Sequence, residues 1–401
     1  MKYRKFGSTG FEVSALGLGC MRLPTQRMRL QKIDVPEATR IIRSAVDKGI
    51  NYIDTGLPYH FGESERVLGD ALKGGYREKV HLVTKLPMFL VSRESDFEKY
   101  LNRQLEKLQT DFLDTYLFHG LNAGGFEKMK RLNLMDKMLK AREEGTIKYI
   151  GFSFHDVLPV FKEIVDFFDW DVVQIQYNYM DTAVQATTEG LKYAAGKGMA
   201  TVIMEPVKGG KLANPPEEAV EVMEKSTVKR SPVDWALQYL WNLPEVSVVL
   251  SGMGSMRMLE ENCESAENSG IATLTQAELD TIDKLTEIYR KNILVHCTAC
   301  QYCMPCPFGV YIPRNFAIIN NMSTEISTLR RFMAKRSYRK LAGSDKQLND
   351  ERTNGNAAMC TKCGVCVEKC PQSINIPEEL KKVHAIVKQG KKIEDLYPST
   401  V

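Results

Sequence analysis

The chain has 401 residues, 43% of them hydrophobic, and a formal net charge of +4. This length and composition allow a large buried core and exclude a chain that is disordered throughout. Residues 1–11 lack the apolar segment of a signal peptide, and no stretch reaches the roughly 18 apolar residues that span a bilayer. We therefore expect a cytoplasmic protein with no membrane partner.

The charge is divided unevenly along the chain. Residues 291–401 hold 17 Lys and Arg against 9 Asp and Glu, a net charge of +8, so residues 1–290 carry a net charge of −4. The densest basic run, at 330–340, predicts either a docking surface for an acidic redox partner or a solvated helix face. A nucleic-acid partner is not expected, because no nucleic-acid-binding motif accompanies the charge.

From residue 14 onwards, short apolar runs alternate with amphipathic stretches. The runs predict strands at 15–20, 51–55, 80–85, 113–119, 147–153, 172–177, 200–205 and 246–251, and the stretches predict helices at 36–48, 63–72, 95–108, 126–144, 184–197, 233–240 and 256–265. Eight alternations within about 250 residues favour an α/β fold, the (β/α)8 TIM barrel. A Rossmann domain is not expected, because no G-x-G-x-x-G motif follows an early strand.

The pattern changes after a last amphipathic helix at 276–290, which we expect to close the barrel. The chain is thus predicted to contain a barrel domain, residues 1–290, and a smaller, mostly helical domain, residues 291–401. In the second domain, residues 315–341 have a helical pattern, and residues 345–356 have the polar composition of a connection.

The second domain contains two runs of four cysteines, each followed by proline: Cys297, Cys300, Cys303 and Cys306, then Cys360, Cys363, Cys366 and Cys370. The second run has the C-x2-C-x2-C-x3-C-P spacing of bacterial ferredoxins with two clusters, in which the last cysteine binds the neighbouring cluster. We therefore expect a ferredoxin-type domain with two [4Fe–4S] clusters. One would be held by Cys297, Cys300, Cys303 and Cys370, and the other by Cys360, Cys363, Cys366 and Cys306.

The first run departs from the standard spacing, because the gap before Cys306 is one residue shorter. Structural zinc and disulfides are the alternative interpretations of the cysteines. Zinc usually takes four ligands from two C-x2-C pairs separated by a loop, and cysteines three residues apart are poorly placed to bridge one another. Both alternatives therefore fit the two dense quartets less well than iron–sulfur clusters do.

Four ionisable residues fall at or just after predicted strand ends: Asp54, Tyr59, Lys85 and His119. In TIM barrels the carboxyl ends of the strands form the active site. A lysine ammonium favours ionisation of a neighbouring tyrosine, an aspartate keeps that ammonium charged, and a histidine can orient a carbonyl oxygen. The set predicts hydride reduction of a carbonyl, with the tyrosine supplying the proton.

These residues and their neighbours resemble the aldo-keto reductase superfamily over residues 1–290. The matching segments are FGSTG at 6–10, GLG at 17–19, NYIDT at 51–55 with Tyr59, GESE at 62–65, VTK at 83–85 and YLFH at 116–119. The resemblance implies that Asp54, Tyr59, Lys85 and His119 are the catalytic residues. Together with the cysteines, it indicates the ferredoxin-fused branch of that superfamily.

The resemblance also implies a nicotinamide cofactor, NADP or NAD, bound across the barrel mouth. It assigns Ser153 and Gln174 to the carboxamide, Met204 to the nicotinamide ring, Gly252 and Arg257 to the segment near the 2′-phosphate of NADP, and Glu261 and Asn262 to the adenine. Two positions depart from the family. Met204 stands where a tyrosine is common, and the segment at 251–255 lacks the usual lysine, so the choice between NAD and NADP stays open.

We expect an NAD(P)-dependent oxidoreductase that acts on a small carbonyl or alcohol substrate. Hydride carries two electrons whereas each cluster takes one, so direct coupling calls for a flavin, for which the sequence shows no motif. Three hypotheses follow: structural or sensory clusters, electron transfer to an acidic carrier such as ferredoxin or flavodoxin, and an inactive barrel in a protein that only transfers electrons. The four ionisable residues argue against the third.

Overall fold

The computed structural model describes residues 1–26, 29–323, 328–341 and 355–398. The chain divides into two compact units, residues 1–207 with 230–275 and residues 208–229 with 276–401. Each unit has a hydrophobic core of its own.

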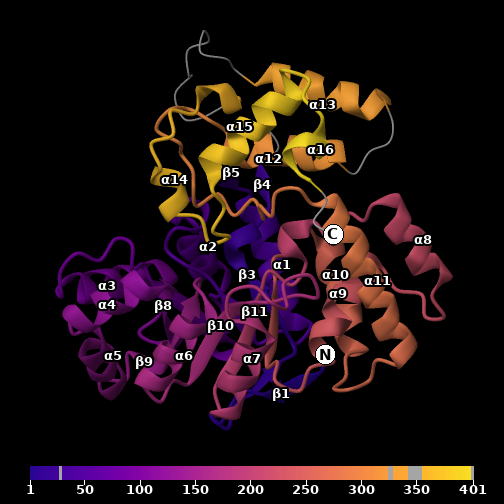
Figure 1. The fold of residues 1–401 in the computed structure, drawn as a ribbon. Coiled ribbons are helices and arrows are strands. Elements are labelled where there is room, and N and C mark those ends of the chain that lie inside the picture. Colours follow the sequence, from indigo (N-terminus) through magenta and orange to yellow (C-terminus); the bar gives the residue numbers. More distant parts are fainter. Residues whose placement is uncertain (27–28, 324–327, 342–354, 399–401) are drawn as a thin grey trace. The chain divides into compact units, whose positions relative to one another are not determined.

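The first unit contains a closed barrel of eight parallel strands (Figure 1). The strands are β3 (Leu16–Gly19), β6 (Tyr52–Asp54), β7 (His81–Leu86), β8 (Leu113–Leu121), β9 (Ile147–Phe154), β10 (Val172–Gln176), β11 (Ala200–Met204) and β12 (Val248–Ser251). Each pairs with the next along the chain, and β12 pairs with β3 to close the ring. The predicted TIM barrel is confirmed.

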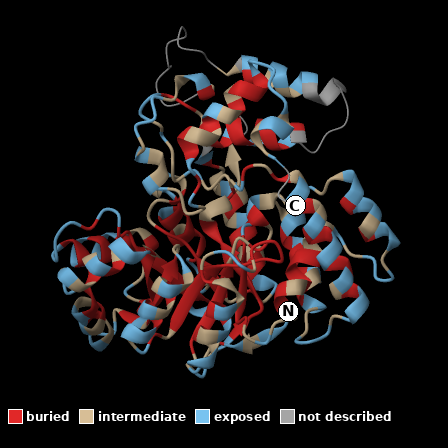
Figure 2. Ribbon diagram, in the orientation of Figure 1, coloured by how far each residue is buried: buried red, intermediate tan, exposed pale blue. Residues whose placement is uncertain are grey.

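The barrel strands are buried on both faces, as Figure 2 shows in red. All six residues of β7 and all five of β10 are buried. Helices cover the outside of such a barrel and side chains fill its inside, so its strands have continuous apolar runs rather than alternating ones. This is why the strands could be found in the sequence.

The helices of the first unit are α1 (Val35–Asp47), α2 (Ser64–Ala71), α3 (Asp96–Leu108), α4 (Ala123–Arg131), α5 (Leu134–Glu143), α6 (Leu158–Phe167), α7 (Thr187–Gly196), α9 (Pro232–Trp241) and α10 (Met256–Glu267). Side chains cap several of their first turns; Asp34 accepts from the Glu37 amide before α1. The single helix predicted at 126–144 is wrong. Asn133, with φ of 49°, breaks it into α4 and α5, because asparagine tolerates the left-handed region.

One short antiparallel hairpin precedes β3 and another follows it. The first joins β1 (Tyr3–Lys5) to β2 (Glu12–Ser14), and the second joins β4 (Thr25–Gln26) to β5 (Arg29–Ile33). Phe6, in the turn of the first hairpin, is fully buried and packs against Tyr52 and His81 from the barrel strands. The hairpin therefore covers the amino-terminal end of the barrel, opposite the strand ends where an active site is expected.

The second unit is mostly helical. It contains α8 (Glu217–Lys225), α11 (Gln276–Asn292), α12 (Ile312–Ser323), α13 (Thr328–Lys340), α14 (Val365–Glu368), α15 (Ile376–Val387) and α16 (Ile393–Leu396). Helix α11, predicted to close the barrel, packs in this unit against α8, and Tyr289 donates to the Leu212 carbonyl. The helix predicted at 315–341 is replaced by α12 and α13, and residues 345–354 of the predicted connection lie outside the described residues.

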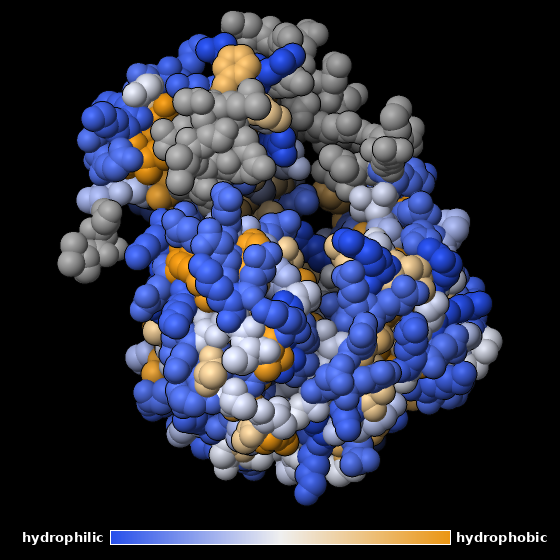
Figure 3. All heavy atoms as spheres, turned by 90° about the vertical axis from the view of Figure 1, so that its right-hand side faces the viewer, coloured by the Kyte–Doolittle hydropathy of each residue, from blue (hydrophilic) through white to orange (hydrophobic). Residues whose placement is uncertain are grey.

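Phe316, Ile319, Leu380 and Val383 are buried in the core of the second unit. Within the described ranges, no helix combines the length and the apolar character that a membrane span requires. The molecular face in Figure 3 is mostly hydrophilic, with hydrophobic residues scattered over it.

Candidate active site and cluster-binding cysteines

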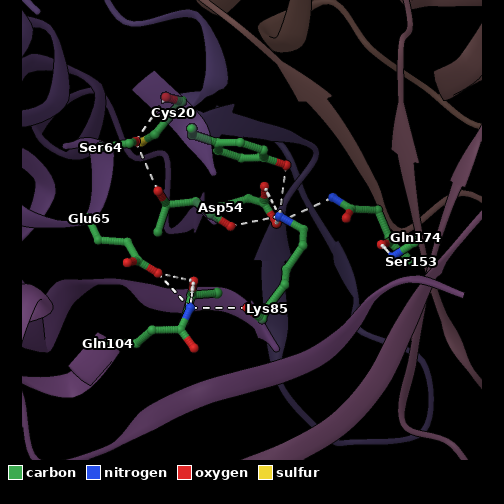
Figure 4. Close-up of polar contacts among 12 residues, drawn as sticks. Cys20, Asp54, Ser64, Glu65, Lys85, Gln104, Ser153 and Gln174 are labelled. Carbon is green, nitrogen blue, oxygen red and sulfur yellow. Dashed lines mark hydrogen bonds and ion pairs between the residues drawn. The ribbon is translucent and has the colours of Figure 1, made fainter. Parts of the chain in front are cut away.

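Lys85 is the centre of a buried polar group at the carboxyl ends of the barrel strands (Figure 4). Its side chain is 1% exposed, and its Nζ lies 2.6 and 2.7 Å from the two Asp54 carboxylate oxygens. The same Nζ donates to the Thr55 carbonyl at 2.7 Å and lies 3.2 Å from the Tyr59 hydroxyl. The ammonium thus bridges a carboxylate and a phenol.

Neighbouring strands bring these residues together. Asp54 is the last residue of β6, Lys85 is next to last in β7, and His119 lies near the end of β8. Tyr59 follows β6 and begins a tight turn, Tyr59–Gly62. The two residues after Tyr59, His60 and Phe61, have φ values of 50° and 57°. A β-carbon on Gly56 would lie 3.3 Å from the Tyr59 ring, so the glycine leaves room for the ring against the backbone.

His119 is 6% exposed, and its ring meets the Tyr59 ring edge-on with centroids 6.0 Å apart. Burial lowers the pKa of His119 well below its ordinary value, and the Lys85 ammonium and then His155 lower it further. The imidazole is therefore neutral at physiological pH. All four residues that the sequence predicted as catalytic converge here.

The charge state of Asp54 is set by two opposing effects. Burial raises the pKa of its carboxyl, while the Lys85 ammonium and the Gln174 amide lower it. An ionised carboxylate buried this deeply requires a partner of opposite charge. The Lys85 ammonium supplies that opposite charge for Asp54.

A second buried polar group, which the sequence did not reveal, forms a hydrogen bond with the backbone carbonyl of Lys85. The Gln104 amide donates to the Lys85 carbonyl at 3.0 Å and to Glu65 Oε1 at 2.6 Å, and Thr84 donates to the same carboxylate oxygen. Glu65 is fully buried, and burial raises the pKa of its carboxyl. Glu65 and Gln104 come from helices α2 and α3, so the group fixes β7 against both.

The residues assigned to the carboxamide lie side by side. Ser153 on β9 and Gln174 on β10 are register partners, and both are buried. The Ser153 hydroxyl accepts from the Gly120 amide at 2.7 Å, and Gln174 Nε2 points to Asp54 at 3.3 Å. Gln174 Oε1 is buried and has no hydrogen-bond partner among the described residues. A buried acceptor without a donor fits the N–H groups of a carboxamide. Met204, half-buried, ends the next strand.

The remaining cofactor candidates follow β12. Gly252 lies in the turn before α10, where a β-carbon would come within 2.7 Å of Arg22 side-chain atoms. Asn262 is buried and donates to the Ser251 hydroxyl, whereas Arg257 and Glu261 form an exposed ion pair at 3.7 Å. The structure thus brings Gly252 and Arg22 together and leaves Arg257 and Glu261 in solvent.

Arg22 is a candidate that the sequence reasoning missed. It ends a short turn, Cys20–Arg22, directly after β3. The only signal in the sequence was a basic residue shortly after the first predicted strand, and its proximity to Gly252 follows from the pairing of β3 with β12.

The cysteines of the second unit gather in two groups. One cavity is lined by Cys297, Cys300, Cys303 and Cys370, with apolar residues of α12 beside them. Burial raises the pKa of Cys303, and Cys300, Cys297, Cys370 and, least of all, Cys366 raise it further. The first three cysteines of one run thus share a site with the last cysteine of the other, as the ferredoxin spacing predicts.

Cys366 belongs to the second group. Burial raises its pKa to about 11, and Cys306, Cys360 and Cys363 contribute to the shift. None of the eight cysteines forms a disulfide. Among the described residues, no three His, Cys, Asp or Glu side chains are grouped as the ligands of one metal ion. The ligands of a [4Fe–4S] cluster are arranged differently from those of a single ion, because the four thiolates surround a whole cluster. The donor set fits two such clusters.

The fold and the site together define an oxidoreductase of the TIM-barrel class with an iron–sulfur domain. The chain belongs to the aldo/keto reductase family, whose model matches residues 15–287. A model described as a 4Fe-4S dicluster domain matches residues 296–376. The predicted family and the predicted cluster domain are confirmed, and the dicluster match favours clusters over the zinc and disulfide alternatives.

Characterised and uncharacterised relatives match most of the chain. An uncharacterized oxidoreductase, YqkF, of Bacillus subtilis is 27% identical over 329 residues, covering 73% of this chain and 99% of that protein. L-galactose dehydrogenase of Arabidopsis thaliana is 27% identical over 306 residues, covering 70% and 94%. The solved structure of aldo-keto reductase AKR11C1 from Bacillus halodurans, holo form, has a TM-score of 0.60 and 26% identity, covering 71% and 96%.

Proposed function

We propose that the barrel transfers a hydride between NAD(P)H and a small carbonyl or alcohol substrate. The observation that carries this proposal is the position of Lys85 Nζ, 3.2 Å from the Tyr59 hydroxyl and within 2.7 Å of both Asp54 oxygens. This arrangement supplies a proton at one defined atom. L-galactose dehydrogenase, one of the relatives, supports chemistry between an alcohol and a carbonyl.

In carbonyl reduction, the Tyr59 hydroxyl donates its proton to the carbonyl oxygen. The O–H bond of Tyr59 breaks, and the Lys85 ammonium stabilises the phenolate that is left. Asp54 holds the ammonium in place and balances its charge. His119, neutral in its buried position, can donate a hydrogen bond that orients the carbonyl oxygen toward Tyr59.

A nicotinamide cofactor, when bound, would supply the hydride for the carbonyl carbon. Ser153 and Gln174 would hold the carboxamide, which matches the acceptor of Gln174 that has no other partner among the described residues. Gly252 and Arg22 would hold the phosphates, since the glycine lets the chain approach closely and the guanidinium is a good phosphate ligand. Either NAD or NADP is compatible with this set.

For the second unit, we infer two [4Fe–4S] clusters that transfer electrons, in a protein of the cytoplasm, where thiolates stay reduced. The acidic carrier, such as ferredoxin or flavodoxin, would dock on α13. Lys335, Arg336 and Arg339 are exposed there next to Phe332, whose side chain is 57% exposed. The side chains of Arg330, Arg331 and Lys340 lie outside the described residues. A bound flavin would convert two-electron to one-electron steps.

The experiment is anaerobic purification, followed by iron, flavin and nicotinamide analysis and an assay of NAD(P)H oxidation by simple aldehydes. Tyr59→Phe should abolish reduction while cofactor binding persists. Tyr52→Phe is the matched control, because it also removes a tyrosine hydroxyl. Tyr52 lies in β6, and its hydroxyl has no hydrogen-bond partner among the described residues. Full turnover in Tyr59→Phe would contradict the proposal.

The docking proposal has its own test. Neutral replacements of Lys335, Arg336 and Arg339 should flatten the salt dependence of electron transfer from reduced ferredoxin, because steering is screened over about 8 Å at physiological ionic strength. NAD(P)H-driven aldehyde reduction should be unaltered by the same replacements. An unchanged salt dependence would mean that α13 is a solvated helix face.

A further inference from the structure

A chain of polar side chains runs through the first unit from Asp181 to His155. Gln176 Nε2 donates to Asp181 Oδ2 at 3.0 Å, and Gln185 Nε2 donates to Gln176 Oε1 at 3.4 Å. Gln185 Oε1 in turn lies 3.2 Å from His155 Nδ1. Asp181 is 2% exposed and Gln176 is 1% exposed, and Asn178 donates to the same Asp181 oxygen.

The orientation of the two amides gives the bonds in this chain their direction. Gln176 presents its NH2 group to Asp181 and its oxygen to Gln185. Gln185 must then present its NH2 group to Gln176 and its oxygen to the imidazole. His155 Nδ1 therefore carries the proton, and Nε2 is the acceptor of the ring.

His155 lies at the same barrel end as the catalytic group. Its backbone amide donates to the Leu121 carbonyl at the end of β8. Its Cδ2, which is bonded to Nε2, would lie 3.8 Å from a β-carbon on Gly120, the residue after His119. Burial lowers the pKa of His155 to about 4, so the ring stays neutral and keeps its acceptor at physiological pH.

This end of the barrel thus offers two kinds of hydrogen-bonding group. Tyr59 and His119 can donate to a carbonyl oxygen, whereas His155 Nε2 can only accept. A substrate that satisfies both sides needs a donor close to its carbonyl, and a hydroxyl group meets that need. A substrate without the donor would leave the acceptor unsatisfied when bound, which costs affinity and rate.

We propose that His155, held by Gln185, is a specificity-determining residue whose Nε2 accepts a hydrogen bond from a substrate hydroxyl, so that the preferred substrates are hydroxycarbonyl compounds. The inference rests on the proposed carbonyl reductase function and deepens it. It concerns the group beside the carbonyl and leaves the roles of Tyr59 and Lys85 unchanged.

The test compares lactaldehyde with propanal, which differ by one hydroxyl group. The ratio of their kcat/KM values should favour lactaldehyde by at least tenfold, and this ratio should fall at least tenfold in His155→Phe. The intrinsic reactivity difference between the two aldehydes is the same for every variant, so the change in the ratio reports the protein's contribution. Gln185→Leu should lower the ratio as well, and Gln185→Glu, which still accepts from Nδ1, should restore it.

A second readout is independent of turnover. NMR of protein labelled with 15N-histidine, with His155 assigned by comparison with His155→Gln, should show the Nδ1–H tautomer in the original protein and a mixture in Gln185→Leu. An Nε2–H tautomer, or a lactaldehyde preference that survives in His155→Phe, would overturn the inference while leaving carbonyl reduction in place. Failure of the purified holoenzyme to reduce either aldehyde would instead overturn the proposed function, and the specificity inference with it.

Discussion

Lys85 and Asp54 form an ion pair in which both side chains are at most 2% exposed and both carboxylate oxygens lie within 2.7 Å of the ammonium. Removing one member of a buried pair leaves the other charge without compensation. The effect of the pair on stability can therefore be separated by mutation from its proposed role in proton transfer.

Lys85→Met should lower the free energy of unfolding by about 3–5 kcal/mol, because it leaves the Asp54 carboxylate buried and unpaired. The double variant Asp54→Asn with Lys85→Met should recover part of that loss, yet both should lack carbonyl reductase activity. Urea unfolding of the original protein, both single variants and the double variant measures the coupling. Additive losses would show that the pair contributes nothing to stability.

His81 should make the barrel sensitive to acid. Its ring is 3% exposed and stacks on Tyr52 and Tyr149, and burial lowers its pKa from 6.5 to about 4. Between these two pKa values the unfolded chain binds a proton that the folded chain does not, so stability falls as the pH drops from 6.5 to 4 and no further below 4. The loss amounts to about 3 kcal/mol.

The measurement is urea unfolding across that pH range for the original protein and for His81→Gln. The variant loses the ring contacts and is less stable at pH 7, but it should lack the share of the acid slope that His81 supplies. Parallel pH dependences in the two proteins would show that His81 is not the titrating group.

We expect Gly209 to be required for binding of the cluster that Cys297, Cys300, Cys303 and Cys370 would hold. It lies at φ of 65° in the second unit, and a β-carbon there would come within 2.3 Å of the Thr298 carbonyl oxygen, next to Cys297. Gly209→Ala should therefore displace the loop that carries the first cysteines and lower the iron content. Gly210→Ala is the matched control, because Gly210 is also left-handed, at φ of 92°, but a β-carbon on it meets nothing within 4 Å.

Both variants carry the similar cost of a left-handed alanine, about 1 kcal/mol. Any difference between them in iron per chain, or in the visible absorption of the clusters, comes from the contact with Thr298. Equal iron contents would show that this contact does not hold the cluster loop.

The eight barrel strands and the group of Asp54, Tyr59, Lys85 and His119 could be predicted because they depend on local pattern. Buried parallel strands are short apolar runs, and the carboxyl ends of neighbouring strands must meet. The four residues thus followed from their positions along the chain. The cysteine grouping followed from the ferredoxin spacing, in which the last cysteine of a run binds the neighbouring cluster.

Arg22 and His155 could not be predicted in the same way. The proximity of Arg22 to Gly252 results from closure of the barrel, when β3 pairs with β12 from the far end of the domain. The tautomer that we infer for His155 depends on its contact with Gln185, which is 30 residues away in the sequence. Likewise, no periodicity reveals that α8 packs against α11, because an amphipathic helix does not specify its partner.

The crossover of the cysteines gives the last prediction. Cys370 lines one cavity with Cys297, Cys300 and Cys303, so Cys370→Ser should lose the cluster built on the first run. Cys306→Ser should lose the other cluster, because Cys306 lies close enough to Cys366 to raise its pKa. Each variant should retain roughly half of the iron, since each cluster holds four irons.

Iron content alone does not say which cluster is missing, so the thiols freed by its loss are identified by anaerobic alkylation and mass spectrometry. In Cys370→Ser the label should appear on Cys297, Cys300 and Cys303, whereas in Cys306→Ser it should appear on the first three cysteines of the second run. Cys263→Ser, which changes a buried thiol in the barrel unit, serves as the control and should keep all its iron. If the label instead appears on the remaining cysteines of the run that carries the substitution, each run binds its own cluster and the crossover is wrong.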